Sequence, residues 1–256
     1  MSTTLPFFSI ITASYNSEKT ISDTITSVLN LDFKDFEYII IDGNSSDGTT
    51  EIIKSFQPKF KEKGVDYKFI SEKDNGIYDA WNKGIQLSSG KWISFLGSDD
   101  SYLPNALQLY ANEIQTNNTI NYISSQVNLT NEKGDVLSVF GKKYKWKNVI
   151  RDIDTAQVGS FHKRELFDKV GLFSTEYKIV GDLDFYIRCK NDIHAGYFKI
   201  ITANMQNGGV SNQVYTALKE ALKVKLKYGY TSKWFTYYKF YSSLAKCYIK
   251  MALNKK

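Results

Sequence analysis

Short apolar runs alternate with amphipathic stretches along the first hundred residues of the chain. The length and β-branched content of the apolar runs predict buried strands at residues 7–13, 38–41, 67–70 and 92–96. Apolar residues at helical spacing predict helices at residues 17–30, 49–60 and 77–87, and Ser17 is expected to cap the first. The alternation predicts an α/β fold with a mostly parallel sheet flanked by helices.

Each predicted strand ends in a polar loop. These loops cover residues 12–16, 42–47, 72–76 and 97–101. The carboxyl ends of parallel strands lie along one edge of a sheet, and ligands bind beyond that edge. The pattern therefore predicts a binding site built from these four loops.

Beyond residue 103 the pattern is less regular. It predicts helices at residues 104–116 and 182–190, a hairpin of strands at 121–129 and 136–140, and a strand and helix within 160–170. Residues 141–157 are not assigned, and the sequence NGGVSN at 207–212 predicts a flexible loop. We expect one domain over residues 1–211, followed by a helical tail over 212–256.

The tail differs from the body in charge. It contains ten lysines and one acid, Glu220, for a net charge of +9, so the overall charge of +6 leaves −3 for residues 1–211. Aromatic and small residues recur at helical spacing between residues 234 and 252, with lysines and serines on the opposite face. Two interpretations stay open: a helix lying on an anionic membrane surface, or a helix packing its aromatic residues on the body while its lysines are solvated.

Composition narrows the class of protein. Basic charge confined to the tail is unlike a nucleic-acid-binding domain, whose body is basic. No apolar run approaches the roughly 20 residues that span a bilayer, and the first residues lack the features of a signal peptide. Cys189 and Cys247 lie far apart within helix-like patterns, so neither a disulfide nor a metal knuckle is expected. These features favour a cytoplasmic protein.

Two adjacent carboxylates, Asp99 and Asp100, follow the fourth predicted strand in SFLGSDDSYLP. Such a pair is useful where a divalent cation binds oxygen ligands and neutralises a leaving diphosphate. The alternative is a surface turn that caps the next helix. Asp42 and Asp74 are expected at the same edge, where a carboxylate accepts hydrogen bonds from a base or a ribose, although Asp42 can also close an Asx-turn.

Six segments occur in a characteristic order. They are IITASYN, IIIDGNSSDGTTEII, SEKDNGIYDAWNKGI, GKWISFLGSDD, VGDLDFYIR and NGGVS. Together they resemble bacterial family 2 glycosyltransferases with the GT-A fold, of the type that builds capsule, exopolysaccharide and O-antigen. The resemblance covers about residues 7–211 and divides the domain into a nucleotide-binding half, about 1–103, and an acceptor half, about 104–211.

The resemblance implies inverting transfer of a single sugar from a UDP-, GDP- or dTDP-sugar to a glycan or lipid-linked saccharide during surface polysaccharide synthesis. It implies Mg²⁺ or Mn²⁺ on Asp100. The other implied donor-site residues are Thr12 and Tyr15 in the nucleotide pocket, Asp42 at the base, Asp74 and Gly76 bordering the nucleotide, Asp79 near the donor, and Asp99 at the ribose. The tail would then contact an anionic membrane at the inner face of the cell, where a lipid-linked acceptor lies.

Asp182 is implied as the general base that takes the proton of the acceptor hydroxyl. A sugar hydroxyl is a poor nucleophile at neutral pH, so a carboxylate within hydrogen-bond reach assists its attack. The pattern alone favours an N-cap for Asp182. Asp184 is a competing candidate, although Arg188 lies at i,i+4 spacing and can pair with it.

The chain departs from the family pattern at three places. Ser98 stands where the metal motif often has its first Asp, Gly181 stands where a Glu often precedes the base, and the Gln-x-x-Arg-Trp signature of processive synthases is not found. The last departure favours transfer of one sugar. Two other functions stay open: a sugar nucleotidyltransferase, against which the lack of Gly and Arg in TASYNSEKT counts, and a nucleotide- or carbohydrate-binding protein with degenerate catalysis.

Overall fold

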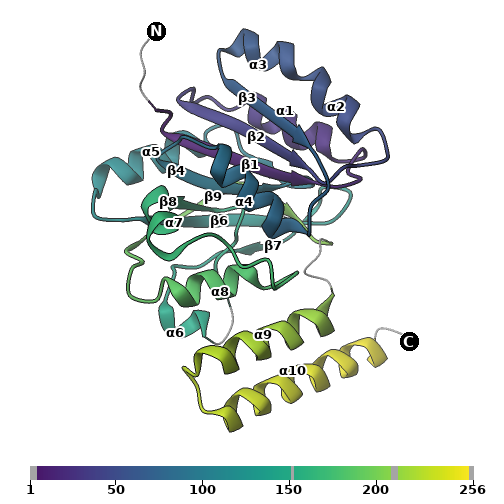
Figure 1. Cartoon of the computed structure of the whole chain (residues 1–256), viewed down its shortest axis with the longest axis vertical. Helices are drawn as coiled ribbons and strands as arrows, with labels where there is room; N and C mark the ends of the chain where they lie inside the picture. The colour runs from purple at the N-terminus through teal and green to yellow at the C-terminus, as the bar shows by residue number, and fades with distance from the viewer. Residues whose placement is uncertain (1–4, 151–152, 209–212, 254–256) are drawn as a thin grey trace.

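The computed structural model describes residues 5–150, 153–208 and 213–253, and these residues form a nine-stranded sheet with helices on both faces (Figure 1). The strand order is β3-β2-β1-β4-β8-β6-β9-β5, and β7 pairs with β6. The strands are β1 Phe8–Ser14, β2 Phe36–Asp42, β3 Asp66–Ser71, β4 Trp92–Gly97, β5 Ser101–Tyr102, β6 Tyr122–Thr130, β7 Val136–Phe140, β8 Ser160–Lys163 and β9 Ala195–Gln206. The predicted α/β class is confirmed.

Alternation along the strands builds two cores, one on each face of the sheet. In β1, Phe8 and Ile10 point into one core and Ile11 into the other, and β2 behaves in the same way. The first core is covered by α1 Ile21–Leu29, α2 Thr49–Ser55, α3 Gln57–Lys63 and α5 Ala106–Thr116. The second is covered by α4 Ile77–Leu87, α7 Arg164–Val170, α8 Gly181–Arg188 and α9 Val214–Tyr228.

The parallel part of the sheet is its first half. β1 pairs in parallel with both β2 and β4, and β2 with β3, so Ser14 lies opposite Asp42 and Asp42 opposite Ser71. The second half is mixed, because β8 is antiparallel to both β4 and β6, while β9 is parallel to β6. The prediction of a mostly parallel sheet therefore holds for the half that carries the polar loops.

Three sequence predictions need correction. The first helix begins at Ile21 rather than after Ser17, because a turn in which the Ser17 carbonyl accepts two N–H groups precedes it. The predicted helix over 49–60 is two helices, since Pro58 lacks the N–H that a continuous helix requires and instead lies in the first turn of α3. The long strand β9 was not predicted, because its buried and exposed positions do not alternate.

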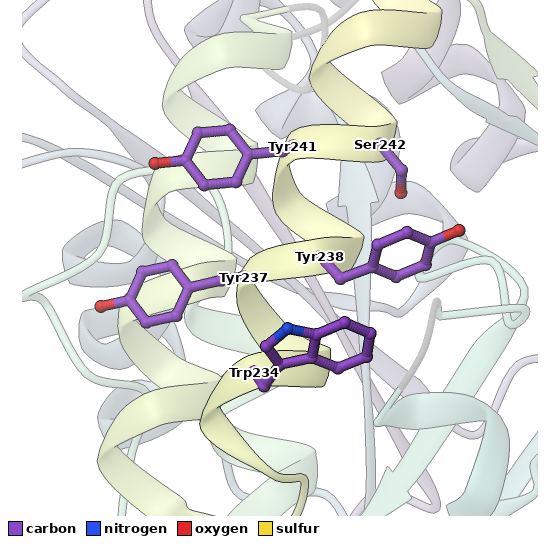
Figure 2. A pocket seen from close by; sticks show the side chains of 5 residues that line it. All are labelled: Trp234, Tyr237, Tyr238, Tyr241 and Ser242. Carbon is purple, nitrogen blue, oxygen red and sulfur yellow. The ribbon is translucent and has the colours of Figure 1, made fainter.

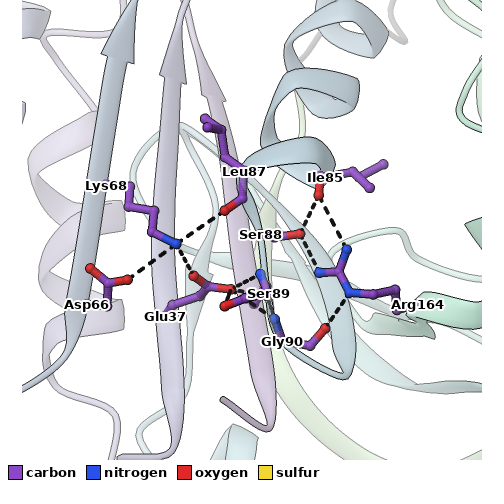
Figure 3. Close-up of polar contacts among 10 residues, drawn as sticks. Glu37, Asp66, Lys68, Ile85, Leu87, Ser88, Ser89, Gly90 and Arg164 are labelled. Atoms are coloured by element: carbon purple, nitrogen blue, oxygen red, sulfur yellow. Dashed lines mark hydrogen bonds and ion pairs between the residues drawn. The ribbon is translucent and has the colours of Figure 1, made fainter. Parts of the chain in front are cut away.

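The amino edge of the parallel strands is held by a buried carboxylate, Glu37 (Figure 3). It accepts hydrogen bonds from Lys68 (2.6 Å), Ser9 Oγ (2.7 Å) and the Gly90 N–H (3.0 Å). Burial alone would raise the pKa of Glu37, but hydrogen bonds from Lys68, Ser89 and Ser9 outweigh it and lower that pKa. This acidic group is structural and lies at the amino ends of the strands, away from the predicted site.

The tail forms an antiparallel pair of helices, α9 and α10 Lys233–Leu253, beside α8 (Figure 1). The turn between them is held against the short helix α6 Trp146–Val149, because the Tyr230 ring packs edge-on against Trp146 at 5.3 Å. None of the helices in the described part of the chain combines the length and apolarity needed to cross a membrane. Of the predicted loop at 207–212, residues 209–212 lie outside the described residues.

Candidate functional site

Asp42 ends β2 and is fully buried. Its carboxylate accepts hydrogen bonds from Ser14 Oγ (3.1 Å), Ser71 Oγ (2.7 Å), Ser45 Oγ (2.5 Å) and the Ser45 N–H (2.9 Å). The Ser45 N–H lies three residues after Asp42 rather than two, so this bond holds the loop without forming the Asx-turn considered for Asp42. Asp42 thus ties the ends of β1, β2 and β3 together and sets the backbone of the loop that follows.

Tyr15 and Asp74 lie over this edge from opposite sides. A Cβ on Gly43 would lie 2.7 Å from Asp74 Oδ2 and 3.3 Å from the Tyr15 ring. Both side chains therefore occupy space that a side chain at position 43 would fill. Asp74 Oδ1 accepts the Gly76 N–H at 2.9 Å, and Gly76 has a φ of 110°, which only glycine adopts readily. An exposed aromatic ring beside a carboxylate is suited to a planar, hydrogen-bonding ligand such as a base.

Asp99 and Asp100 fold back over the end of β4. A Cβ on Gly97 would lie 2.6 Å from Asp100 Oδ2 and 2.8 Å from Asp99 Oδ1. Burial raises the pKa of Asp99, and burial together with the charge of Asp99 raises the pKa of Asp100 to about 7. Two converging carboxylates repel each other when both are ionised, and a bound cation would relieve that repulsion.

A hollow of about 410 Å³ opens beside this pair. Its lining is polar and includes Asn16, Ser17, Glu18, Lys19, Thr20, Asp47, Ser98, Asp99 and Gln206. Ser98 Oγ, which replaces the usual carboxylate, lies 2.9 Å from Ser17 Oγ. The loops after β1, β2 and β4 therefore meet at one cavity, as the strand order requires.

Asp182 lies in the first turn of α8, one residue inside the helix start, and Val180 rather than Asp182 occupies the N-cap position. Its Oδ1 accepts the Leu183 N–H at 2.8 Å and lies 3.3 Å from the Tyr78 hydroxyl. Burial raises the pKa of Asp182 to about 6, although these two hydrogen bonds partly oppose the shift. A carboxylate with that pKa is suited to accept a proton near neutral pH.

Asp184 is occupied elsewhere. It is buried, accepts a hydrogen bond from Arg188 Nε at 2.9 Å and another from the Tyr228 hydroxyl at 2.9 Å. The i,i+4 pairing with Arg188 expected from the sequence is confirmed. Of the two candidate bases, Asp182 is the one that forms no ion pair within the described part of the chain.

Tyr78 connects Asp182 to the helix that follows the β3 loop. It is in the first turn of α4, two residues after Gly76, and its ring would lie 2.8 Å from a Cβ on Gly181. A larger residue at position 181 would displace that ring, which accounts for glycine where a Glu was expected. The loop after β3 and the start of α8 thus lie in contact.

Of the predicted site residues, Asp99 lines this hollow, and Thr12 and Asp79 bond to residues away from it. Thr12 is fully buried, with Oγ1 at 3.1 Å from the Tyr38 hydroxyl. Asp79 Oδ2 accepts the Asn75 N–H at 3.0 Å and lies 3.8 Å from Lys83 Nζ. Both side chains shape the surrounding loops, and their predicted contacts with donor stay predictions.

Three residues that contact the candidate site residues or the segment before them were not predicted from the sequence. The Gln206 N–H, at the end of β9, donates to Asp100 Oδ1 at 2.9 Å. The Tyr78 hydroxyl reaches Asp182, and Glu220 of the tail bonds to the segment before α8. The apolar run FKIITANM was the signal for β9, whereas nothing in the pattern pairs Glu220 with residue 179.

The residues fit a divalent cation with few protein ligands. The described residues contain no group of three or more His, Cys, Asp or Glu side chains that could hold a metal by themselves. Asp100 Oδ2 and Asp99 Oδ1 nevertheless converge over Gly97, where a side chain would fill the space. Two carboxylate oxygens are enough for a cation that keeps water or binds a diphosphate.

The sequence matches one protein-family model and resembles named glycosyltransferases. The model described as glycosyl transferase family 2 matches residues 9–163. A "PGL/p-HBAD biosynthesis glycosyltransferase" of Mycobacterium bovis is 29% identical over 229 residues, which cover 85% of this chain and 83% of that one.

Solved structures share the fold. S. aureus TarS in complex with UDP-GlcNAc superposes with a TM-score of 0.68 at 18% identity, over 90% of this chain and 69% of that one. The chain spans 41% of the longer TarS structure. A mannosyltransferase from Pyrobaculum calidifontis, in complex with GDP-Man and Mn²⁺, gives a TM-score of 0.64 at 16% identity, over 88% and 64% of the two chains. The predicted GT-A architecture is confirmed by these neighbours.

Proposed function

The chain belongs to glycosyltransferase family 2, and from this membership we propose that it is an inverting enzyme that transfers one sugar from a nucleotide-sugar donor to a glycan or lipid-linked saccharide. The observation that carries the proposal is that Asp99 and Asp100 converge over Gly97, beside a cavity at the carboxyl ends of the parallel strands. The Tyr78 hydroxyl links Asp182 to the helix that starts near these strand ends. One group of carboxylates is thereby suited to the diphosphate side and another to the acceptor side.

The donor nucleotide is proposed to bind across the ends of β1 to β4. Tyr15 and Asp74 would hold the base, with Asp42 and Gly76 fixing the loops behind them, and Asp99 would lie at the ribose. UDP-GlcNAc in TarS and GDP-Man in the mannosyltransferase support a nucleotide-sugar donor here. Thr12 and Asp79 would act at the pocket through the positions of their neighbours.

The reaction is a single displacement at the anomeric carbon. The acceptor hydroxyl oxygen forms a bond to that carbon, its proton passes to Asp182, and the bond from the carbon to the diphosphate oxygen breaks. The leaving nucleoside diphosphate keeps the electron pair of that bond. Asp182 supplies base catalysis only when ionised, and its raised pKa brings its proton affinity closer to that of the hydroxyl.

A divalent cation, Mg²⁺ or Mn²⁺, would be held by Asp100 with Asp99 beside it. When bound it would supply charge neutralisation for the diphosphate. The chain itself contributes the position of Asp100, which is fixed by the Gln206 N–H and by the Thr24 hydroxyl donating to the Asp100 carbonyl at 2.8 Å.

Turnover of nucleotide-sugars tests the function directly. We expect the purified chain, in the presence of Mn²⁺, to release UDP, GDP or dTDP from the matching sugar nucleotide. Release should be slow when the sugar is transferred to water and faster when it is transferred to a saccharide acceptor. Chromatography of the nucleotides measures both. Pyrophosphate release from a nucleoside triphosphate would instead indicate a nucleotidyltransferase, and tight diphosphate binding without any turnover would indicate degenerate catalysis.

We also propose that the tail contacts an anionic membrane at the cytoplasmic face. α10 carries four exposed aromatic side chains on successive turns, drawn in Figure 2: Trp234, Tyr237, Tyr238 and Tyr241, with exposed fractions of 76%, 43%, 55% and 62%. Their exposure supports the first of the two interpretations of the tail, a helix that lies on an anionic membrane surface. Lys233, Lys239 and Lys246 of the same helix are also exposed, and a helix that presents both aromatic rings and lysines to solvent suits a lipid headgroup region.

Charge reversal of these three exposed lysines tests this contact. Each lysine near an anionic surface contributes roughly 1 kcal/mol, so the triple change Lys233→Glu, Lys239→Glu and Lys246→Glu is expected to weaken binding to phosphatidylglycerol vesicles by roughly 10²-fold or more. The matched control changes Lys54, Lys59 and Lys61, on α2 and α3, to Glu, and has the same net charge. Co-sedimentation in which both triple variants behave alike would argue against docking through α10.

A further inference from the structure

Glu220 reaches from the middle of α9 to the segment that precedes α8. Its carboxylate accepts the N–H groups of Lys178 at 3.0 Å, Ile179 at 2.9 Å and Val180 at 3.3 Å. It is the single acid among residues 212–256, which include ten lysines. The one carboxylate of the tail is thus committed to three consecutive backbone donors.

The same segment is held from its other side by Tyr78. The Tyr78 hydroxyl donates to the Ile179 carbonyl at 2.7 Å, and its ring lies against Gly181. Residues 178–181 are therefore clamped between α4 and α9. Asp182 follows directly, so the path of its backbone is fixed by these two contacts.

Other contacts between α9 and the body do not act on this segment. Lys223 pairs with Glu176 at 2.6 Å, and Tyr228 bonds to Asp184. They hold α9 in place from either side of the clamp. Glu220 alone among the α9 contacts described here bonds to the backbone that leads into Asp182.

We infer that Glu220 is a positioning residue for the catalytic step: it holds the 178–180 backbone so that Asp182 faces the acceptor. This inference rests on the proposed function. It also gives α9 a part in catalysis, since a helix of the basic tail fixes the geometry of the acceptor side. The donor side, at the ends of β1 to β4, does not depend on this contact.

Glu220→Ala is expected to lower kcat by roughly 10- to 100-fold, because small displacements of a catalytic group carry losses of that size. The Kd for UDP or GDP with Mn²⁺ should stay within about twofold, since the nucleotide side is untouched. Glu220→Gln keeps one carbonyl oxygen as an acceptor and should recover part of kcat. The matched control is Glu176→Gln, which removes an ion pair between α9 and the body and should leave kcat unchanged.

Hydrogen exchange of the amides of residues 178–180 tests the clamp independently of any turnover. Faster exchange in Glu220→Ala than in Glu176→Gln, at equal melting temperature, supports the inference, and equal exchange overturns it. Activity then separates this inference from the proposed function. If Asp182→Asn abolishes transfer while Glu220→Ala retains wild-type kcat, the positioning role is wrong and the function stands.

Discussion

Asp182→Asn is expected to lower kcat for sugar transfer by roughly 10²- to 10⁴-fold, the usual contribution of a positioned general base. Asparagine preserves the size of the side chain and the oxygen that accepts the Leu183 N–H, but cannot take up the proton of the acceptor. Binding of the donor nucleotide should be unchanged. Because burial penalises the ionised carboxylate at neutral pH, neutralising it should not lower the melting temperature.

The pH dependence follows from the same residue. With its pKa raised to about 6, Asp182 is protonated in acid, so kcat/KM of the wild-type enzyme should fall tenfold per pH unit below about pH 6. In saturating Mn²⁺, which keeps Asp100 ionised, the residual rate of Asp182→Asn should lack that limb. Asp168→Asn, an exposed change on α7, serves as the control and should behave as wild type. Wild-type kcat in Asp182→Asn would exclude it as the base.

Asp100→Asn is expected to remove the dependence of nucleotide-sugar turnover on a divalent cation and to lower kcat/KM by roughly 10²- to 10³-fold, since cations supply several kcal/mol of charge stabilisation. Asparagine keeps the acceptor for the Gln206 N–H, so the loop should keep its shape. Wild-type activity should be lost on EDTA treatment and restored by Mn²⁺, whereas the residual activity of the variant should respond to neither. A variant that Mn²⁺ still activates fully would place the cation elsewhere.

The placement of the proposed donor-side residues at strand ends could be predicted from sequence because it depends on local pattern. The apolar runs place Asp42, Asp74 and Asp99 at or just after the ends of strands. Parallel pairing brings those strand ends together, and this does not depend on how the helices pack. The helix at Ile77–Leu87 was predicted to the residue, since a glycine with positive φ starts it and its apolar face is regular.

The surroundings of Asp182, on the proposed acceptor side, could not be predicted in the same way, because they depend on contacts between distant segments. Gly181 is explained only by the Tyr78 ring, which is about a hundred residues away in the chain. Glu220 was counted as one acid in a basic tail, and its role appears only when α9 packs beside α8. β9 supplies the Gln206 N–H to Asp100, yet its irregular burial hides it from a periodicity search.

The central claim is that these carboxylates form one site for a nucleoside diphosphate and a divalent cation. Calorimetric titration of UDP and of GDP into the wild-type chain and into Asp100→Asn, with Mn²⁺ and with EDTA, tests it most directly. The account predicts that one of the two nucleotides binds the wild type in a manner that Mn²⁺ strengthens, and that Mn²⁺ has no such effect on the variant. Absence of binding by either nucleotide, or an equal effect of Mn²⁺ on both proteins, would contradict it.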